Sequence, residues 1–228
     1  LLRSGLMYPD SCALALGRRA VASYGQLSAR VAKLAGALQS NPNLEVGDRV
    51  AIFAKNKPEY LEIIYGCWHA GLIVVPINSK LHVNELSFIL EDSGAKLCFV
   101  SDDLSATSRS IQSSQLEKII EIGTSDYIGL FEGKESQIVS CDGDVIAWIF
   151  YTSGTTGQPK GAALSHRNLL AMCHCYFTDV DCEGVSKTML HIAPMSHGSG
   201  LYSLAQIMRG RVNVFPESAG FDVKEVFS

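Results

Sequence analysis

The 228-residue sequence is 47% hydrophobic and 18% charged, which is ordinary for a globular α/β protein and excludes a disordered or fibrous chain. Its net charge of -4, without a stripe of Lys and Arg, excludes a general affinity for nucleic acid. The longest apolar runs, at 72–77 and 145–150, are far shorter than the roughly 20 residues that cross a bilayer, so no membrane span is expected.

The first half of the chain alternates between strand and helix patterns. Apolar residues at three- and four-residue steps predict an amphipathic helix over 24–39. Short β-rich runs and helical runs then follow each other in turn. We expect strands at 49–54, 72–76 and 96–100, and helices at 58–70 and 84–91.

The alternation weakens after position 100 and becomes clear again from Asp144. Because parallel strands need crossover helices, the order predicts mainly parallel sheets flanked by helices, with 1–228 forming part of one domain. The expected elements are a helix at 103–113, strands at 118–122 and 144–151, a loop to Gly161, a helix from Ser165, a strand at 188–193, a loop at 194–200, a helix to Arg209, a strand at 211–215 and a helix from Phe221.

The cysteines bear on location and on metal binding. The chain opens without the basic and apolar regions of a secretory signal peptide, and seven scattered cysteines fit reduced thiols, so we expect a cytoplasmic protein. Cys173, Cys175 and Cys182, with His174 among them, could suggest a metal site. The first pair is C-x-C and no second pair follows at finger spacing, so free thiols are favoured and no metal site is predicted.

A loop with the composition of a phosphate site follows the strand that ends at Tyr151. Residues 151–161 read Y-T-S-G-T-T-G-Q-P-K-G. Glycines let backbone N–H groups converge, hydroxyls add donors and a lysine adds a compact positive charge, which together suit a polyphosphate. From composition alone, a simple Gly/Ser/Thr connector is the alternative. The candidate phosphate ligands are Thr152, Ser153, Gly154, Thr155, Thr156, Gly157 and Lys160.

Spacing excludes two other well-known motifs. A Walker A loop needs G-x-x-x-x-G-K-[ST], but Pro159 stands at the second glycine and Gly161 at the metal-binding hydroxyl. A hydrolase nucleophile elbow needs G-x-S-x-G, but Tyr151 precedes Ser153, and His197 precedes Ser199, where the first glycine should be.

The loop resembles the phosphate-binding signature of the adenylate-forming superfamily, Y-T-S-G-T-T-G-x-P-K-G. This superfamily holds acyl- and aryl-CoA synthetases, luciferases and the adenylation domains of peptide synthetases. Segments elsewhere are also similar to family patterns: 23–27, 47–52, 68–71 and 76–78. The resemblance thus covers nearly the whole chain and identifies it as the N-terminal part of the large adenylate-forming domain.

The resemblance implies two half-reactions. A carboxylic acid, expected to be a fatty acid, reacts with ATP and Mg²⁺ to give an acyl-adenylate, and CoA then displaces AMP. We rank an acyl-CoA synthetase first because the segment 194–201 looks like that of a CoA ligase. The alternatives are a non-catalytic nucleotide- or acyl-binding module, and an adenylation domain or luciferase-like relative.

A second cluster spans 191–201, where a strand should end and a helix begin. In the family, the corresponding motif lies at the acyl pocket, and its histidine or aromatic residue contacts the substrate carboxylate region. The resemblance therefore assigns substrate binding to His197, Gly198, Ser199 and Gly200, and catalytic roles to His197 and Lys160. A helix-capping histidine is the alternative for His197.

The other histidines have plainer interpretations. His166 looks like the family's x-H-x-N step, but local hydrogen bonding at a helix start explains it as well. The remaining four are interpreted as structural: His69, His82, His174 and His191.

Later family motifs do not occur in this sequence. The Y-G-x-T-E stretch that helps bind Mg²⁺ is one, since Tyr24-Gly25 is followed by Gln26-Leu27. A ribose-binding aspartate motif, a hinge and a C-terminal lysine motif are the others. We therefore expect the remainder of the large domain and the C-terminal domain to lie outside this sequence, and the 228 residues to be inactive alone.

Overall fold

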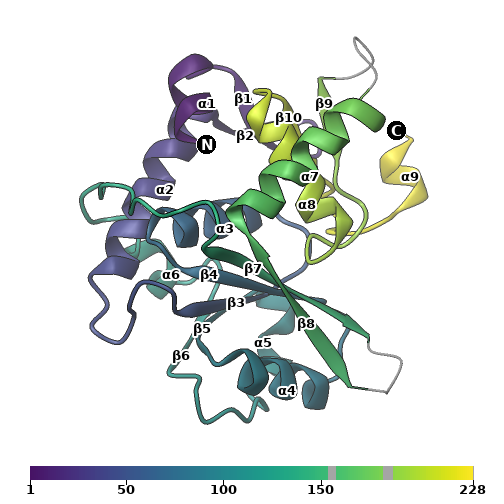
Figure 1. Cartoon of the computed structure of the whole chain (residues 1–228). Coiled ribbons are helices and arrows are strands. Elements are labelled where there is room, and N and C mark those ends of the chain that lie inside the picture. Colours follow the sequence, from purple (N-terminus) through teal and green to yellow (C-terminus); the bar gives the residue numbers. More distant parts are fainter. Residues whose placement is uncertain (154–157, 182–186, 228) are drawn as a thin grey trace.

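A computed structural model describes residues 1–153, 158–181 and 187–227 (Figure 1). The helices are α1 Leu2–Met7, α2 Tyr24–Gln39, α3 Glu59–His69, α4 Val83–Ser93, the 3₁₀ turn η1 Asp102–Leu104, α5 Ser105–Ser108, α6 Ser125–Gly129, α7 His166–Asp179, α8 Gly198–Met208 and α9 Val223–Val226. The strands are β1 Cys12–Leu16, β2 Arg19–Ser23, β3 Arg49–Phe53, β4 Ile73–Ile77, β5 Ala95–Val100, β6 Lys118–Glu121, β7 Ile146–Ser153, β8 Pro159–Ser165, β9 Thr188–Leu190 and β10 Val212–Phe215.

The described strands form two sheets. The larger has the order β6-β5-β3-β4-β7-β8 and is parallel except for the β7–β8 hairpin. The smaller has the order β2-β1-β10-β9 and is parallel except for the β1–β2 hairpin. The predicted α/β class with mainly parallel sheets is confirmed.

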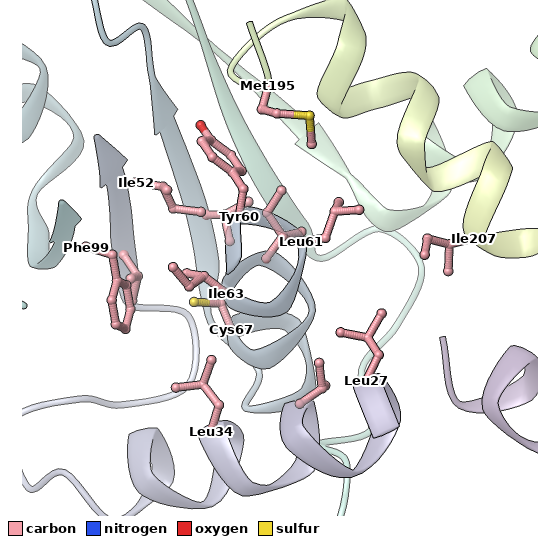
Figure 2. Close-up of a cluster of buried hydrophobic side chains, with 14 of the residues drawn as sticks. Leu27, Leu34, Ile52, Tyr60, Leu61, Ile63, Cys67, Phe99, Met195 and Ile207 are labelled. Atoms are coloured by element: carbon pink, nitrogen blue, oxygen red, sulfur yellow. The ribbon is translucent and has the colours of Figure 1, made fainter. Parts of the chain in front are cut away.

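Helices cover both faces of the larger sheet, which explains its continuous apolar strands. Side chains of a strand alternate between the two faces. In β3, Val50 and Ile52 join the core cluster beneath α2 and α3, whereas Ala51 and Phe53 join the cluster beneath α4. Figure 2 shows the first cluster, in which Leu34 of α2 lies next to Cys67 of α3 and Leu27 lies on the side of Leu61.

Local sequence fixes the starts of the main helices. The hydroxyl of Ser23 accepts a hydrogen bond from the backbone of Gln26, whose side chain accepts one from the backbone of Ser23, so α2 starts with a capping box. Ser165 and Asn168 form the same arrangement before α7. Of the residues that the structure describes, no helix is long and apolar enough to span a membrane.

Several sequence predictions were wrong in detail. The expected helix over 103–113 is only η1 and α5, which end at Ser108, and further along the hydroxyls of Ser113 and Ser114 donate to Glu91. The expected loop up to Gly161 is shorter than predicted, because β7 continues to Ser153 and β8 begins at Pro159. The strand expected at 188–193 ends at Leu190. Five elements were not predicted at all: α1, β1, β2, α6 and β8.

Candidate active site

The phosphate-loop sequence lies at the tip of the β7–β8 hairpin. Thr152 pairs with Lys160 across the antiparallel ladder, so the two side chains leave the same face at the base of the loop, and both are exposed. Within the described part of the chain, Lys160 has no carboxylate partner, which leaves its charge available for an anion. The predicted ligands Gly154, Thr155, Thr156 and Gly157 lie outside the described residues, and the side chain of Ser153 is not described either.

The base of the hairpin is fixed by Tyr151. Its buried phenol donates a hydrogen bond to Asp92 of α4 over 2.5 Å. Burial, followed by this hydrogen bond, raises the pKa of Tyr151 well above its ordinary value, so the group stays a neutral donor. Gly161 faces the ring, and a Cβ atom there would come within 3.0 Å of Tyr151 Cζ and 2.8 Å of Ile149 Cγ2. This glycine is therefore needed for packing, a role that the sequence alone did not reveal.

The segment 191–197 joins the smaller sheet to α8 and carries the second predicted cluster. His191 is fully buried, with Nδ1 2.8 Å from Ser199 Oγ and Nε2 2.9 Å from Asn213 Oδ1, and its ring stacks on Phe215. Burial lowers the pKa of His191 to about 4, against a smaller raising effect of the Asn213 hydrogen bond. The plain structural interpretation of His191 thus misses a polar network that ties the segment to α8.

His197 stands at the end of this segment, immediately before α8. Its side chain makes no capping hydrogen bond to α8, so the capping alternative is wrong. Nδ1 lies 2.8 Å from Ser196 Oγ, and the half-buried ring meets Phe150 of β7 edge-on at 5.4 Å between centroids. His197 therefore contacts the strand that leads into the phosphate loop.

A small cavity of about 100 Å³ joins the two predicted clusters. Thr152 and Pro159 contribute from the hairpin, and His197 contributes from the segment before α8. This cavity lies at the carboxyl ends of β4 and β7, the edge at which open α/β sheets bind ligands. Its lining is completed by Pro76, Asn78, Leu81, Glu85, Ile89 and Tyr151.

The four residues predicted to bind the acid lie in different environments. Gly198 is exposed, and a Cβ atom there would meet nothing within 4 Å. Ser199 and Gly200 are buried. The hydroxyl of Ser199 faces His191, and a Cβ atom at Gly200 would lie 1.9 Å from the carbonyl oxygen of Met195. His197 and Gly198 can thus face a ligand, whereas Ser199 and Gly200 build the turn behind them.

Three of the remaining histidines have local partners, and the described cysteines are free. His69 Nε2 lies 3.0 Å from the carbonyl oxygen of Ser136, and His82 caps α4. His166 is half-buried against Trp68, and burial lowers its pKa. Among the residues described, no cluster of three or more His, Cys, Asp or Glu side chains is placed to hold a metal ion. Cys182, one of the cysteines considered for such a site, lies outside them.

Comparison with known proteins decides the family. A sequence model described as AMP-binding enzyme matches residues 2–227. The chain belongs to the AMP-binding enzyme family. It is similar to the feruloyl-CoA synthase of an Amycolatopsis species, with 32% identity over 92% of this chain and 41% of that protein. The fatty acid–[acyl-carrier-protein] ligase ScoC of Streptomyces coeruleorubidus is 36% identical over 66% of the chain and 29% of its own length.

The fold agrees with this assignment. The N-terminal domain of FACL13 from Mycobacterium tuberculosis, solved with an inhibitor bound, superposes with a TM-score of 0.88 at 26% identity, covering 99% of this chain and 57% of that one. The predicted membership of the adenylate-forming enzymes is confirmed. This AMP-binding chain spans about 41% of the length of the feruloyl-CoA synthase that it matches.

Proposed function

We propose that the chain forms the first part of an AMP-forming acid–thiol ligase, which activates a carboxylic acid with ATP and passes the acyl group to CoA. The observation that carries this proposal is the cavity that His197 shares with the base of the phosphate hairpin. Acyl-adenylate formation requires a carboxylate to be held next to an α-phosphorus, and two neighbouring binding surfaces serve that need.

On the ATP side, the hairpin would bind phosphate. Lys160 offers an ammonium without a carboxylate partner among the described residues, and Thr152 offers a hydroxyl on the same exposed face, which fits a polyphosphate. Neutralising the charge that develops on departing pyrophosphate lowers the barrier of the first half-reaction. Ser153, Gly154, Thr155, Thr156 and Gly157 are proposed to complete this binding loop.

On the acid side, His197 would hold the carboxylate. An imidazole N–H at the start of a helix can donate to a carboxylate oxygen, and the exposed Gly198 beside it lets a ligand approach the backbone closely. Ser199 and Gly200 contribute to substrate binding by shaping this turn. Mg²⁺, when bound with ATP, would offset phosphate charge.

The names of two relatives indicate which acids and which thiol acceptors to consider. One named relative acts on a feruloyl group, and another joins a fatty acid to an acyl-carrier protein. We propose a fatty acid and CoA for this protein, with an aromatic acid or a carrier-protein thiol as the competing choices. Six described cysteines are free, which supports a reducing compartment such as the cytoplasm.

The test uses the extended protein, meaning this chain together with the rest of the sequence encoded by its own gene. ATP–pyrophosphate exchange is measured with short, long and aromatic acids, and thioester formation with CoA and with a carrier protein. We expect acid-dependent exchange by the extended protein and none by residues 1–228 alone. Exchange with none of the acids would favour a non-catalytic binding module, and exchange by the 228 residues alone would show that their site is complete.

A further inference from the structure

Asn56 lies directly behind the segment that carries His197. It follows β3 of the larger sheet and is buried. Its Nδ2 donates to the carbonyl oxygens of His191 and Ala193, at 2.8 and 2.7 Å, and its Oδ1 accepts from the backbone N–H of Met195 at 3.0 Å. An amide uses both kinds of hydrogen-bonding group here, which a carboxylate or an apolar side chain cannot do.

These three backbone groups belong to a segment without a regular hydrogen-bond ladder. β9 ends at Leu190, and α8 begins at Gly198. Buried backbone groups need partners, so Asn56 replaces the neighbouring strand that the segment lacks. The buried side chain of Met195 belongs to the same core cluster as Tyr60 of α3 (Figure 2), which gives the segment an apolar anchor beside the polar one.

Asn56 is itself held on both sides. The backbone N–H of Lys55 donates to Ser101 Oγ at 3.3 Å, and the side-chain ammonium of Lys55 pairs with Asp103 at 2.6 Å. Lys57 pairs with Asp102 at 2.8 Å. Such surface pairs each contribute little to stability, but together they attach the chain around Asn56 to the end of β5.

We propose that Asn56 is a positioning residue for the acid side of the reaction. By fixing the segment 191–195 against the larger sheet, Asn56 sets His197 against Phe150 and beside the phosphate hairpin. Asn56 acts through His197 and lines no part of the cavity that His197 shares with the hairpin. This inference rests on the proposed function, in which His197 binds the carboxylate.

The test compares variants of the extended protein. Asn56→Asp puts a carboxylate against two carbonyl oxygens, and Asn56→Ala removes the partner of three backbone groups, those of His191, Ala193 and Met195. Each variant should lower kcat/KM for the acid roughly 10- to 100-fold, while KM for ATP changes less than about threefold. Tyr127→Phe is the control, because it removes a buried hydrogen bond of 2.6 Å to Glu62, between α6 and α3. The control should lower Tm but leave the constants for the acid within about twofold.

A double-mutant cycle separates positioning from general destabilisation. In a His197→Ala background, Asn56→Ala should lower kcat/KM for the acid less than about threefold, because the group that it positions is gone. Amide hydrogen exchange of the peptide 191–197 should be faster in Asn56→Ala than in the wild type, and unchanged in Tyr127→Phe. Asn56→Ser replaces the alanine variant if the latter does not fold.

The outcomes distinguish this inference from the proposed function. An inactive extended protein, or a His197→Ala variant with unchanged constants for the acid, would overturn the assigned role of His197. If His197→Ala is impaired and the effect of Asn56→Ala is fully additive with it, or no larger than that of Tyr127→Phe, the positioning role of Asn56 alone is overturned.

Discussion

The two halves of the candidate site are built in different ways. The phosphate hairpin consists of strands adjacent in sequence, and its base exposes Thr152 and Lys160. The acid-side segment is anchored by the buried residues His191 and Met195, and Asn56 binds Met195 from 139 positions away. The first half therefore depends on local sequence and the second on tertiary contacts. Substitutions in the hairpin should affect ligand binding, whereas substitutions around the segment should also affect folding.

The largest expected effect is on the acid side, at Gly200. Gly200→Ala would place a Cβ atom 1.9 Å from the carbonyl oxygen of Met195. The clash is with backbone, so the segment must move, and we expect a loss of about 3 kcal/mol of stability. Thermal unfolding of the extended protein measures this loss.

Gly198→Ala is the matched control, since a Cβ atom at Gly198 meets nothing within 4 Å. It should leave Tm unchanged or slightly higher, because alanine is the better helix former. Equal Tm values for the two alanine variants would contradict the tight packing inferred for the turn before α8.

The next effect is on the ATP side, at Lys160. Lys160→Ala should lower kcat/KM for ATP roughly 10- to 150-fold, equivalent to the loss of about 1.5–3 kcal/mol of a charge-assisted contact. Its Tm should stay within about 1 °C of the wild type, because the side chain is exposed. ATP–pyrophosphate exchange at varied ATP concentration is the measurement.

Lys160→Arg provides the control for charge. The arginine keeps the positive charge but replaces a compact ammonium with a planar guanidinium, so the variant should recover part of the rate lost in Lys160→Ala. Unchanged kinetics in Lys160→Ala would contradict its role in binding ATP. A large fall in the Tm of this variant would show that Lys160 has a structural role instead.

Much of the fold could be predicted from local pattern. The helix over 24–39 was predicted to the residue, because its apolar spacing and its capping residues agree. β1 was not predicted, since its partner β10 lies about 200 residues away, as the pair Leu14–Asn213 shows. β8 was not predicted either: its residues are mostly exposed and pair only with β7, so no alternation of apolar residues marks the strand.

The site was predictable to a different degree in its two halves. A continuous motif led to Lys160, and a strand-to-helix step led to His197. Asn56 was missed because its partners are backbone groups of a distant segment, which leave no local pattern. His191 carried a weak signal, as an ionisable residue directly after the apolar pair Met189-Leu190. A buried position for such a residue requires polar partners, and the fold supplies them.

The smallest expected effect at neutral pH is on the stability of a His191 variant, again on the acid side, and it comes with a change in the pH dependence of stability. Burial lowers its pKa to about 4 in the folded protein, against about 6.5 when unfolded. Above pH 6.5 the imidazole is neutral in both states and causes no pH dependence. Between about pH 6.5 and 4 the unfolded state binds the extra proton, so stability falls with falling pH by at most about 1.4 kcal/mol per unit.

His191→Gln removes this titration and so tests whether the segment depends on a neutral imidazole. The variant should be less stable at pH 7.5 by about 1–2 kcal/mol, because its contacts with Ser199 and Asn213 are weakened. As the pH falls below 6.5, the stabilities of wild type and variant should meet at about pH 5–6 and then cross, since only the wild type loses the contribution of residue 191. Urea unfolding of both proteins across this range measures the difference, in which the effects of all carboxylates cancel. Parallel stability curves would mean that His191 keeps an ordinary pKa in the folded protein. The environment of its imidazole would then be less buried than the structure shows, and the contrast with the exposed phosphate hairpin would be smaller.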